Sequence, residues 1–459
     1  MAPRVLDGRS LLLILFAILG LACAFAPAAH ANSSGSAERT NPIVKPVAAD
    51  PSIVRGPDGM YYLFSTSDDW RDGRGLRLLP IFKSFDLTNW MYAGTVFDRP
   101  PAWQSGNRGL WAPDIHYVNG QYRLYYSLGG GDNPCIGLAT AASPTGPWTD
   151  LGRAVFCAND IGIKGTIDPF LWADSAGQSL FVGNFHGVYA VPLDVAGSVP
   201  AGRPVRVADN RFEAAYVEQH DGYYYLFVSA GDCCTGASSA YRVLVGRSTS
   251  ITGPYVDRAG RNLNEGGGDV ILAGNQAWVG PGHNAVVADD AGTDWLVYHA
   301  TPRDNLSLPG GLQRREGMID RIVWANGWPQ IGNGSPSSAG SELPEVRLPV
   351  RVSMRDASAN ALPAQGGVIS ATLRVQAFAD RGFTGQVWVE VTKPDGGRFG
   401  PIFGPVQVNL QPGAVFEVPV SYTVAQQDAG GMYDMVGYAG GFPLQPVEFG
   451  TTTVLKSAP

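Results

Sequence analysis

The chain has 459 residues, of which 45% are hydrophobic and only 16% are charged, so it can bury a large core and is not a disordered polymer. Glycine (59 residues) and proline (34 residues) are too frequent for a helical bundle and indicate many turns between short strands. The formal net charge of -7, without a cluster of Lys or Arg, argues against a nucleic-acid or anionic-membrane partner and favours a neutral one.

Residues 1–31 have the pattern of a secretory signal peptide. Arg4 and Arg9 precede an apolar segment, and Ala29-His30-Ala31 forms a small-x-small cleavage site. The apolar segment is too short to span a bilayer, and no later run is long enough to do so. We therefore expect a secreted or periplasmic protein that begins at Asn32, with lipidation of Cys23 as the less favoured alternative.

Five segments repeat one pattern, in which a turn containing glycine precedes an aromatic and aliphatic run. The glycines of these turns are Gly59, Gly120, Gly177, Gly222 and Gly292. Each segment is typical of a hairpin that enters a buried strand. The separations of 61, 57, 45 and 70 residues have the scale of a four-stranded propeller blade. We therefore predict an all-β fold, with a five-bladed β-propeller over residues 32–331.

The repeat stops at a segment rich in Gly and Ser, which we interpret as a linker over residues 332–344. Residues 345–459 alternate apolar and polar side chains with period two, as residues 368–375 illustrate. This pattern predicts a small C-terminal β-sandwich. The sequence leaves open whether that domain binds glycans or only packs against the rest of the chain.

Four cysteines remain after removal of the signal peptide: Cys135, Cys157, Cys233 and Cys234. An oxidising compartment permits three pairings. We favour Cys135 with Cys157 and the adjacent pair Cys233 with Cys234, because a ring between neighbours would stiffen their loop. Four buried thiols are the alternative, and the absence of a CxxC motif leaves a zinc site without support.

Candidate functional residues appear nine positions before each repeat glycine. They are Asp50, Trp111, Asp168, Glu213 and His283. An equal offset from a structural landmark predicts an equivalent place in each blade, on the innermost strand, so these side chains should converge around the central axis. A lone Asp-Pro or a lone His is usually structural, but three carboxylates and a histidine at one offset are costly to bury without a function.

Clustered carboxylates suit glycoside hydrolysis. That reaction needs one carboxyl group that keeps its proton as an acid and another that is ionised as a base or nucleophile. Neighbouring negative charges separate the two pKa values without an organic cofactor. Ordered motifs surround these positions: Asp50-Pro51-Ser52-Ile53, Leu110-Trp111-Ala112-Pro113-Asp114-Ile115, Ile167-Asp168-Pro169, Phe212-Glu213-Ala214-Ala215-Tyr216, the stretch from Cys233 to Ser248, and Gly280-Pro281-Gly282-His283-Asn284.

Together these motifs resemble glycoside hydrolase family 43, and its arabinan-degrading members in particular. The resemblance covers the propeller and implies an inverting enzyme that acts on α-1,5-linked L-arabinofuranose chains. It implies that Asp50 is the general base, that Glu213 is the general acid, and that Asp168 raises the pKa of the acid. It further implies a calcium or sodium ion on the propeller axis near His283. The implied sugar-binding residues are Trp111, Thr166, Ile167, Asn184, Phe185 and His186.

Two departures bear on the substrate. Ala49 stands where arabinanases usually carry His before the first catalytic Asp, and His186 stands where they usually carry Trp. We favour endo cleavage, because no bulky insertion separates Trp111 from Glu213, although the polar loop at 68–74 would border the same face. The alternatives are an exo-acting α-L-arabinofuranosidase or β-xylosidase, and a non-catalytic carbohydrate-binding propeller. We expect a monomer whose partner is arabinan or an arabino-oligosaccharide.

Overall fold

The computed structural model describes residues 41–103, 109–338, 342–355, 357–358, 361–443 and 445–457, so the predicted signal peptide lies outside the described residues. Within these ranges, helix is limited to α1 (Ala158–Ile161) and the short 3-10 turn η1 (Gly236–Ser238). The predicted all-β class is confirmed. No helix in the described part of the chain is long and apolar enough to cross a membrane.

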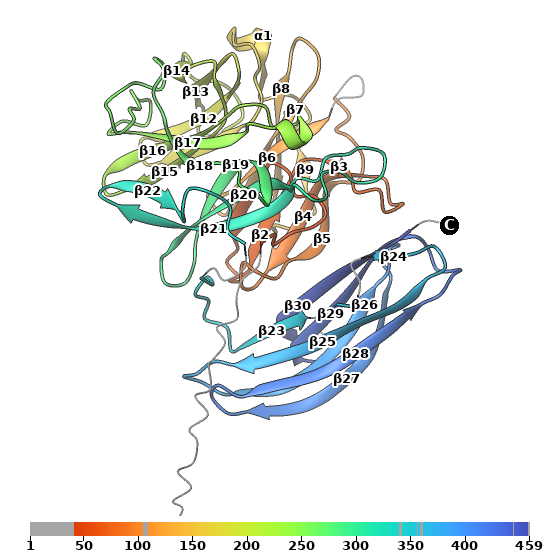
Figure 1. The fold of residues 1–459 in the computed structure, drawn as a ribbon. Coiled ribbons are helices and arrows are strands. Elements are labelled where there is room, and N and C mark those ends of the chain that lie inside the picture. Colours follow the sequence, from red (N-terminus) through yellow and green to blue (C-terminus); the bar gives the residue numbers. More distant parts are fainter. Residues whose placement is uncertain are drawn as a thin grey trace, which may run out of the picture. The chain divides into compact units, whose positions relative to one another are not determined.

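Five antiparallel sheets follow one another along the chain up to Ile331 (Figure 1). The first contains β1 (Ser52–Arg55), β2 (Tyr61–Phe64), β3 (Asp68–Asp69), β4 (Leu76–Ser84) and β5 (Met91–Phe97). The second contains β6 (Leu110–Val118), β7 (Gln121–Leu128), β8 (Cys135–Ala141), β9 (Thr149–Asp150) and β10 (Phe156–Cys157). The third contains β11 (Phe170–Asp174), β12 (Gly177–Asn184), β13 (Gly187–Leu193) and β14 (Val205–Ala208). The fourth contains β15 (Phe212–His220), β16 (Tyr223–Ala230), β17 (Arg242–Ser248) and β18 (Asp269–Leu272). The fifth contains β19 (Trp278–Ala288), β20 (Asp294–Pro302), β21 (Glu316–Ala325) and β22 (Trp328–Ile331).

The repeat glycines occupy the turns that the sequence predicts. Each lies at the hairpin between the first two strands of its sheet, where β1 pairs with β2, β6 with β7, β11 with β12, β15 with β16 and β19 with β20. All five have positive φ, from 76° at Gly292 to 142° at Gly177. Glycine adopts this backbone region without the steric cost that a Cβ would bring.

The five sheets contact one another in a closed ring. Strand β1 contacts β6 and β19, β6 contacts β11, and β15 contacts both β11 and β19. A separate apolar cluster fills each of the five spaces between neighbouring sheets. The cluster between the fifth and first sheets includes Trp295 and Leu63, and a bridge between Val44 and Gly317 joins the chain's early residues to β21. Burial of apolar surface between sheets therefore holds the first strands around a common centre.

Two further sheets follow the ring. One contains β23 (Val350–Arg355), β25 (Gly367–Ala377) and β28 (Val415–Val424). The other contains β24 (Ala361–Leu362), β26 (Phe383–Thr392), β27 (Arg398–Leu410), β29 (Gly431–Gly441) and β30 (Gln445–Lys456). The alternation that predicted this region is visible in β25, where every second side chain from Ile369 to Ala377 is buried. One apolar cluster contains residues of both sheets, among them Leu373 and Val389.

The two disulfides have the pairing that the sequence favoured. Cys135 and Cys157 occupy paired positions on β8 and β10 and are bonded to each other. Cys233 and Cys234 are bonded within the loop that connects β16 to β17. That loop leads directly to Tyr241, which lies in the candidate site.

Candidate active site

In each of the five sheets, a residue with left-handed backbone lies within the first strand or two residues before it. These residues and their φ angles are Asp50 (52°), Ala112 (43°), Asp168 (56°), Ala214 (52°) and His283 (51°). A residue with a Cβ is strained in this region, and such strain is common at functional sites. The sequence predicted one equivalent place for all five candidates, and this is correct only for Asp50, Asp168 and His283.

Trp111 and Glu213 stand one residue before the left-handed position of their sheets. The reason is a register shift in each strand, between Trp111 and Asp114 in β6 and between Glu213 and Tyr216 in β15. An extra residue in a strand changes which side chain faces a given direction. Glu213 is nevertheless 9% exposed, so the shift leaves it buried.

Hydrogen bonds from one sheet to the next hold four of the left-handed residues. The backbone N–H of Ala112 donates to Thr66 Oγ1 (2.8 Å), that of Asp168 to Ser127 Oγ (2.9 Å), that of His283 to Ser229 Oγ (2.9 Å), and that of Asp50 to His299 Nδ1 (3.1 Å). Each acceptor lies on the second strand of the preceding sheet or, for Thr66, two residues after that strand, and the last bond closes the ring from the fifth sheet to the first.

The fourth sheet departs from this pattern. The backbone N–H of Ala214 donates to the carboxylate of Asp168 rather than to the second strand of the third sheet. Asn184 occupies the corresponding place on that strand, and its buried Oδ1 accepts no hydrogen bond from a described residue. This change of acceptor links Asp168 to Ala214, the residue after Glu213, and leaves the side-chain amide oxygen of Asn184 without an inter-sheet hydrogen bond from a described residue.

The carboxylate of Asp50 is surrounded by donors. Thr66 Oγ1 donates to Asp50 Oδ2 (2.6 Å), and Arg315 Nη1 lies 2.9 Å from Oδ1 and 3.0 Å from Oδ2. His283 Nδ1 lies 3.3 Å from Asp50 Oδ1. Burial alone would raise the pKa of Asp50, but the charges of Arg315 and His283 outweigh it and hold that pKa well below the ordinary value. Asp50 is therefore ionised.

Glu213 has the opposite protonation. Burial and, next, the negative charge of Asp168 raise its pKa to about 8, although the hydrogen bond from Tyr241 opposes both. The pKa of Asp168 is also raised, first by burial, and the two carboxyls titrate as a pair. Tyr241 Oη donates to Glu213 Oε1 at 2.8 Å. The site thus contains one ionised carboxylate and one carboxyl group that keeps its proton at neutral pH.

The two histidines beside Asp50 have different charges. Burial opposes protonation of His283, but Asp50 and the other two carboxyls outweigh burial and raise its pKa to about 9. Burial lowers the pKa of His299 to about 3, so this imidazole is neutral. His299 Nδ1 lies 3.4 Å from Asp50 Oδ1, but the same nitrogen accepts the backbone N–H of Asp50, so the contact is not an ion pair.

The predicted sugar-binding residues differ in accessibility. Trp111 is 37% exposed and Phe185 is 41% exposed, whereas Asn184 and Ile167 are half-buried. The ring of Trp111 lies against Gly109 and Gly129, where any Cβ would fall within about 2 Å of it. His186, which follows Phe185, is exposed.

Thr166 does not fit the predicted sugar contact. Its side chain is fully buried, and its hydroxyl donates to the carbonyl oxygen of Ile163 at 2.9 Å. A side chain without exposed surface supports the loop before Asp168 and presents nothing to a ligand. We therefore exclude a sugar contact by the Thr166 side chain.

Four side chains of the site were not predicted individually: Thr66, Tyr241, His299 and Arg315. A sequence signal existed for two of them, because the residues seven positions after the repeat glycines are Thr66, Ser127, Asn184, Ser229 and His299, all of which are polar. Tyr241 and Arg315 come from a loop end and from the residue before β21, and no repeat marks them.

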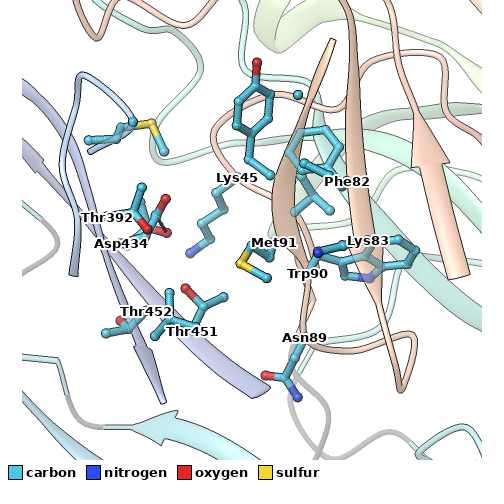
Figure 2. A pocket seen from close by; sticks show the side chains of 18 of the residues that line it. Lys45, Phe82, Lys83, Asn89, Trp90, Met91, Thr392, Asp434, Thr451 and Thr452 are labelled. Carbon is cyan, nitrogen blue, oxygen red and sulfur yellow. Dashed lines mark hydrogen bonds between the residues drawn. The ribbon is translucent and has the colours of Figure 1, made fainter. Parts of the chain in front are cut away.

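A cavity of about 860 Å³ lies elsewhere, against the outer strands of the first sheet and a C-terminal sheet (Figure 2). Figure 2 shows Lys45 reaching into it, with Met91 of β5 and Asp434 of β29 among the lining residues. None of the three clustered carboxyls lines it. The cavity is therefore separate from the acid–base site.

An ionised carboxylate and a protonated carboxyl group in one buried cluster are what acid–base glycosidases require. The chain belongs to family 43 of the glycosyl hydrolases, whose family model matches residues 39–329. It is therefore a glycoside hydrolase, and the family predicted from the motifs is confirmed.

Named relatives come from several organisms. The chain is 35% identical to "Extracellular endo-alpha-(1->5)-L-arabinanase 1" of Bacillus subtilis (strain 168), over 61% of this chain and 86% of the relative. It is also 35% identical to "Extracellular exo-alpha-(1->5)-L-arabinofuranosidase ArbA" of Cellvibrio japonicus (strain Ueda107), over 61% of this chain and 85% of the relative. Among solved structures, the Cellvibrio cellulosa alpha-L-arabinanase complexed with arabinohexaose matches with a TM-score of 0.54 and 30% identity, over 62% of this chain and 96% of the other.

The pKa of Glu213 predicts a pH-dependent effect on stability. Because the folded state binds this proton more tightly than the unfolded state, folding stability falls as pH rises from the ordinary value near 4.5 through about 8. Glu213→Gln removes that loss. The variant should gain on the order of 2 to 4 kcal/mol over the wild type at pH 9 and little at pH 5. Chemical denaturation at both pH values measures this difference, and an equal gain at both would contradict the raised pKa.

Proposed function

We propose that this enzyme is a secreted, inverting hydrolase of α-1,5-linked L-arabinofuranose in arabinan, with endo action. The observation that carries the proposal is the opposite protonation of Asp50 and Glu213 within one buried cluster. Relatives named for this linkage at 35% identity, and a structural neighbour bound to arabinohexaose, support the choice of substrate. The extracellular names of two relatives, together with the predicted signal peptide, support secretion.

In the proposed mechanism, Asp50 takes a proton from a water molecule whose oxygen attacks the anomeric carbon. The bond from that carbon to the leaving oxygen breaks as Glu213 gives its proton to the same oxygen. Asp168 keeps the pKa of Glu213 high by its negative charge and is anchored by the N–H of Ala214. Attack from the face opposite the leaving group inverts the anomeric configuration.

We assign sugar contacts to Trp111, Phe185, Asn184, Ile167 and His186. Two exposed aromatic rings beside a buried acid–base cluster suit a neutral carbohydrate, because sugar C–H faces pack on aromatic rings while hydroxyls need polar partners. The half-buried amide side chain of Asn184 supplies such a partner. An α-furanoside fills these subsites in the proposed complex.

We further infer that the five sheets are the blades of a five-bladed propeller and that the two C-terminal sheets form a β-sandwich. The closed ring of contacts supports the first inference, and the shared core of the two sheets supports the second. The propeller then corresponds to residues 32–331 and the sandwich to 345–459, joined by a linker at 332–344. We propose that the enzyme acts as a monomer.

Exo cleavage by the same residues is the second candidate. One relative at 35% identity is named an exo-acting arabinofuranosidase. In addition, Asp68 of β3 lies near Arg315 and Asp50: burial raises its pKa to about 6, the charge of Arg315 lowers it and that of Asp50 raises it. A loop on that side would shorten the groove, as the polar segment at 68–74 suggested from the sequence.

We propose that a calcium or sodium ion binds beside His283. Within the described residues, no group of three or more His, Cys, Asp or Glu side chains could hold a metal, so water would complete the coordination shell. Three carboxyls lie near His283 and would attract such an ion, whose binding would displace the proton from the imidazole. When bound, the ion would supply positive charge that offsets repulsion among the carboxylates.

Turnover should depend on both proposed catalytic carboxyls. Asp50→Asn and Glu213→Gln should each lower kcat on arabinan by about 10²–10⁴-fold. An aryl arabinofuranoside whose leaving group needs no proton should partly restore the Glu213→Gln rate but not the Asp50→Asn rate. Glu218→Gln is the matched control, because Glu218 is a largely buried carboxyl with a raised pKa near the other end of β15. Activity near that of the wild type in either catalytic variant would contradict the assignment.

Debranched arabinan distinguishes endo from exo action. Endo cleavage should cause early loss of viscosity and a ladder of oligosaccharides, because internal bonds are cut at random. Proton NMR in the first minutes should show the inverted anomer. Release of arabinose or one short oligomer at nearly constant viscosity would move the assignment to the exo alternative, and a retained anomer would contradict the role of Asp50 as a base.

Removal of the ion tests the metal proposal. Exhaustive dialysis against a chelator should lower both the melting temperature and kcat, and addition of Ca²⁺ or Na⁺ should restore them. Elemental analysis of the untreated protein gives the identity and stoichiometry of the ion. A protein that contains no metal, and whose stability and rate are unchanged after chelation, would instead show that the charges around His283 balance without one.

A further inference from the structure

One of the four inter-sheet hydrogen bonds has a histidine as its acceptor. The backbone N–H groups of Ala112, Asp168 and His283 donate to the hydroxyl groups of Thr66, Ser127 and Ser229. The N–H of Asp50 donates instead to the imidazole of His299 in the fifth sheet. A hydroxyl group would satisfy the N–H of Asp50 equally well, so the histidine requires another explanation.

The ring of His299 packs against Tyr241. The two rings are nearly parallel, with centroids 5.8 Å apart and an interplanar angle of 12°. Both side chains are buried, with 0% exposure for His299 and 2% for Tyr241. Tyr241 also lies against Gly282 of β19, where a Cβ would fall 2.2 Å from two ring carbons. Tyr241 therefore packs on both the imidazole of His299 and the backbone of β19.

The phenol hydroxyl of Tyr241 contacts Glu213, the second proposed catalytic carboxyl. It donates to Glu213 Oε1 at 2.8 Å, and its pKa is raised well above the ordinary value, first by burial, so it keeps its proton. Because Oε1 already accepts this hydrogen, the acid's own proton belongs on Oε2. One continuous path thus connects the backbone of Asp50, the ring of His299, the ring of Tyr241 and the carboxyl group of Glu213.

We propose that Tyr241 and His299 are positioning residues that fix the general acid relative to the general base, an inference that rests on the roles proposed above for Glu213 and Asp50. His299 fixes the backbone of the base. Tyr241 fixes the carboxyl group of the acid and selects the oxygen that carries the transferable proton. The stack between them makes the two positions depend on each other.

The two positioning residues should differ in their response to the leaving group. Tyr241→Phe removes only the hydroxyl and should lower kcat on arabinan by about tenfold to a hundredfold, with little change in KM. An aryl arabinofuranoside that needs no proton should restore most of this loss. His299→Phe keeps a ring but leaves the N–H of Asp50 unpaired, so its loss should be similar on both substrates. His299→Gln, which returns an acceptor, should recover part of the His299→Phe loss.

The pH profile supplies a readout that a purely structural role would not move. The hydrogen bond from Tyr241 lowers the pKa of Glu213, so Tyr241→Phe should shift the alkaline limb of kcat/KM to higher pH. Tyr225→Phe is the matched control, because Tyr225 is fully buried in the same sheet and donates to the carbonyl oxygen of Gly327 at 2.6 Å. This control should leave the limb unchanged.

The outcomes separate the two levels of the proposal. Wild-type turnover in Glu213→Gln would overturn the acid assignment and the positioning role together. An inactive Glu213→Gln combined with a Tyr241→Phe variant of wild-type kcat and unchanged alkaline limb would overturn the positioning role alone. Thermal melts confirm that each variant folds. If Tyr241→Phe does not fold, equal losses in His299→Gln and His299→Phe overturn the proposal, and recovery in His299→Gln supports it.

Discussion

Five residues at the inner ends of five sheets adopt a left-handed backbone that none of them would prefer in isolation. A neighbouring sheet supplies the hydrogen bond that holds each of the four N–H groups, and the carboxylate of Asp168 holds the fifth. Since the last of these bonds runs from the fifth sheet to the first, the geometry of the centre depends on closure of the whole ring. The apolar clusters between sheets provide the free energy that makes this strain tolerable.

The buried charges at this centre balance only as a group. Asp50 is ionised because Arg315 and the protonated His283 lie beside it. Glu213 keeps its proton because it is buried near Asp168 and no cation among the described residues is in hydrogen-bond contact with it. The like charge of Asp168 and the lack of a contacting cation thus keep Glu213 protonated as the acid. The two cations beside Asp50 keep it ionised as the base. The protonation state of each carboxyl is therefore set by its neighbours and not by its residue type.

The same packing explains why glycine occurs beside the site. Gly282 leaves room for the ring of Tyr241, and Gly109 and Gly129 leave room for the ring of Trp111. In each case an aromatic side chain lies on the backbone where a Cβ would collide with it. The glycines thus place one ring against the acid and another at the exposed rim, and a methyl group at any of these positions would displace the ring.

Periodicity in the sequence determined the all-β class, the five hairpins and the approximate place of Asp50, Asp168 and Glu213, because hairpin glycines recur with the strands and require little information from elsewhere in the chain. The same repeat contained the acceptors seven residues after each glycine, including His299. Only the tertiary structure decided the rest. Register shifts in β6 and β15 moved two candidates by one residue, the buried hydroxyl of Thr166 was used inside its own loop, and Arg315 reached Asp50 from 265 residues away. The physical reason is that pKa values, register shifts and side-chain contacts at this centre depend on how particular residues of neighbouring sheets pack, and the repeat marks only some of those residues.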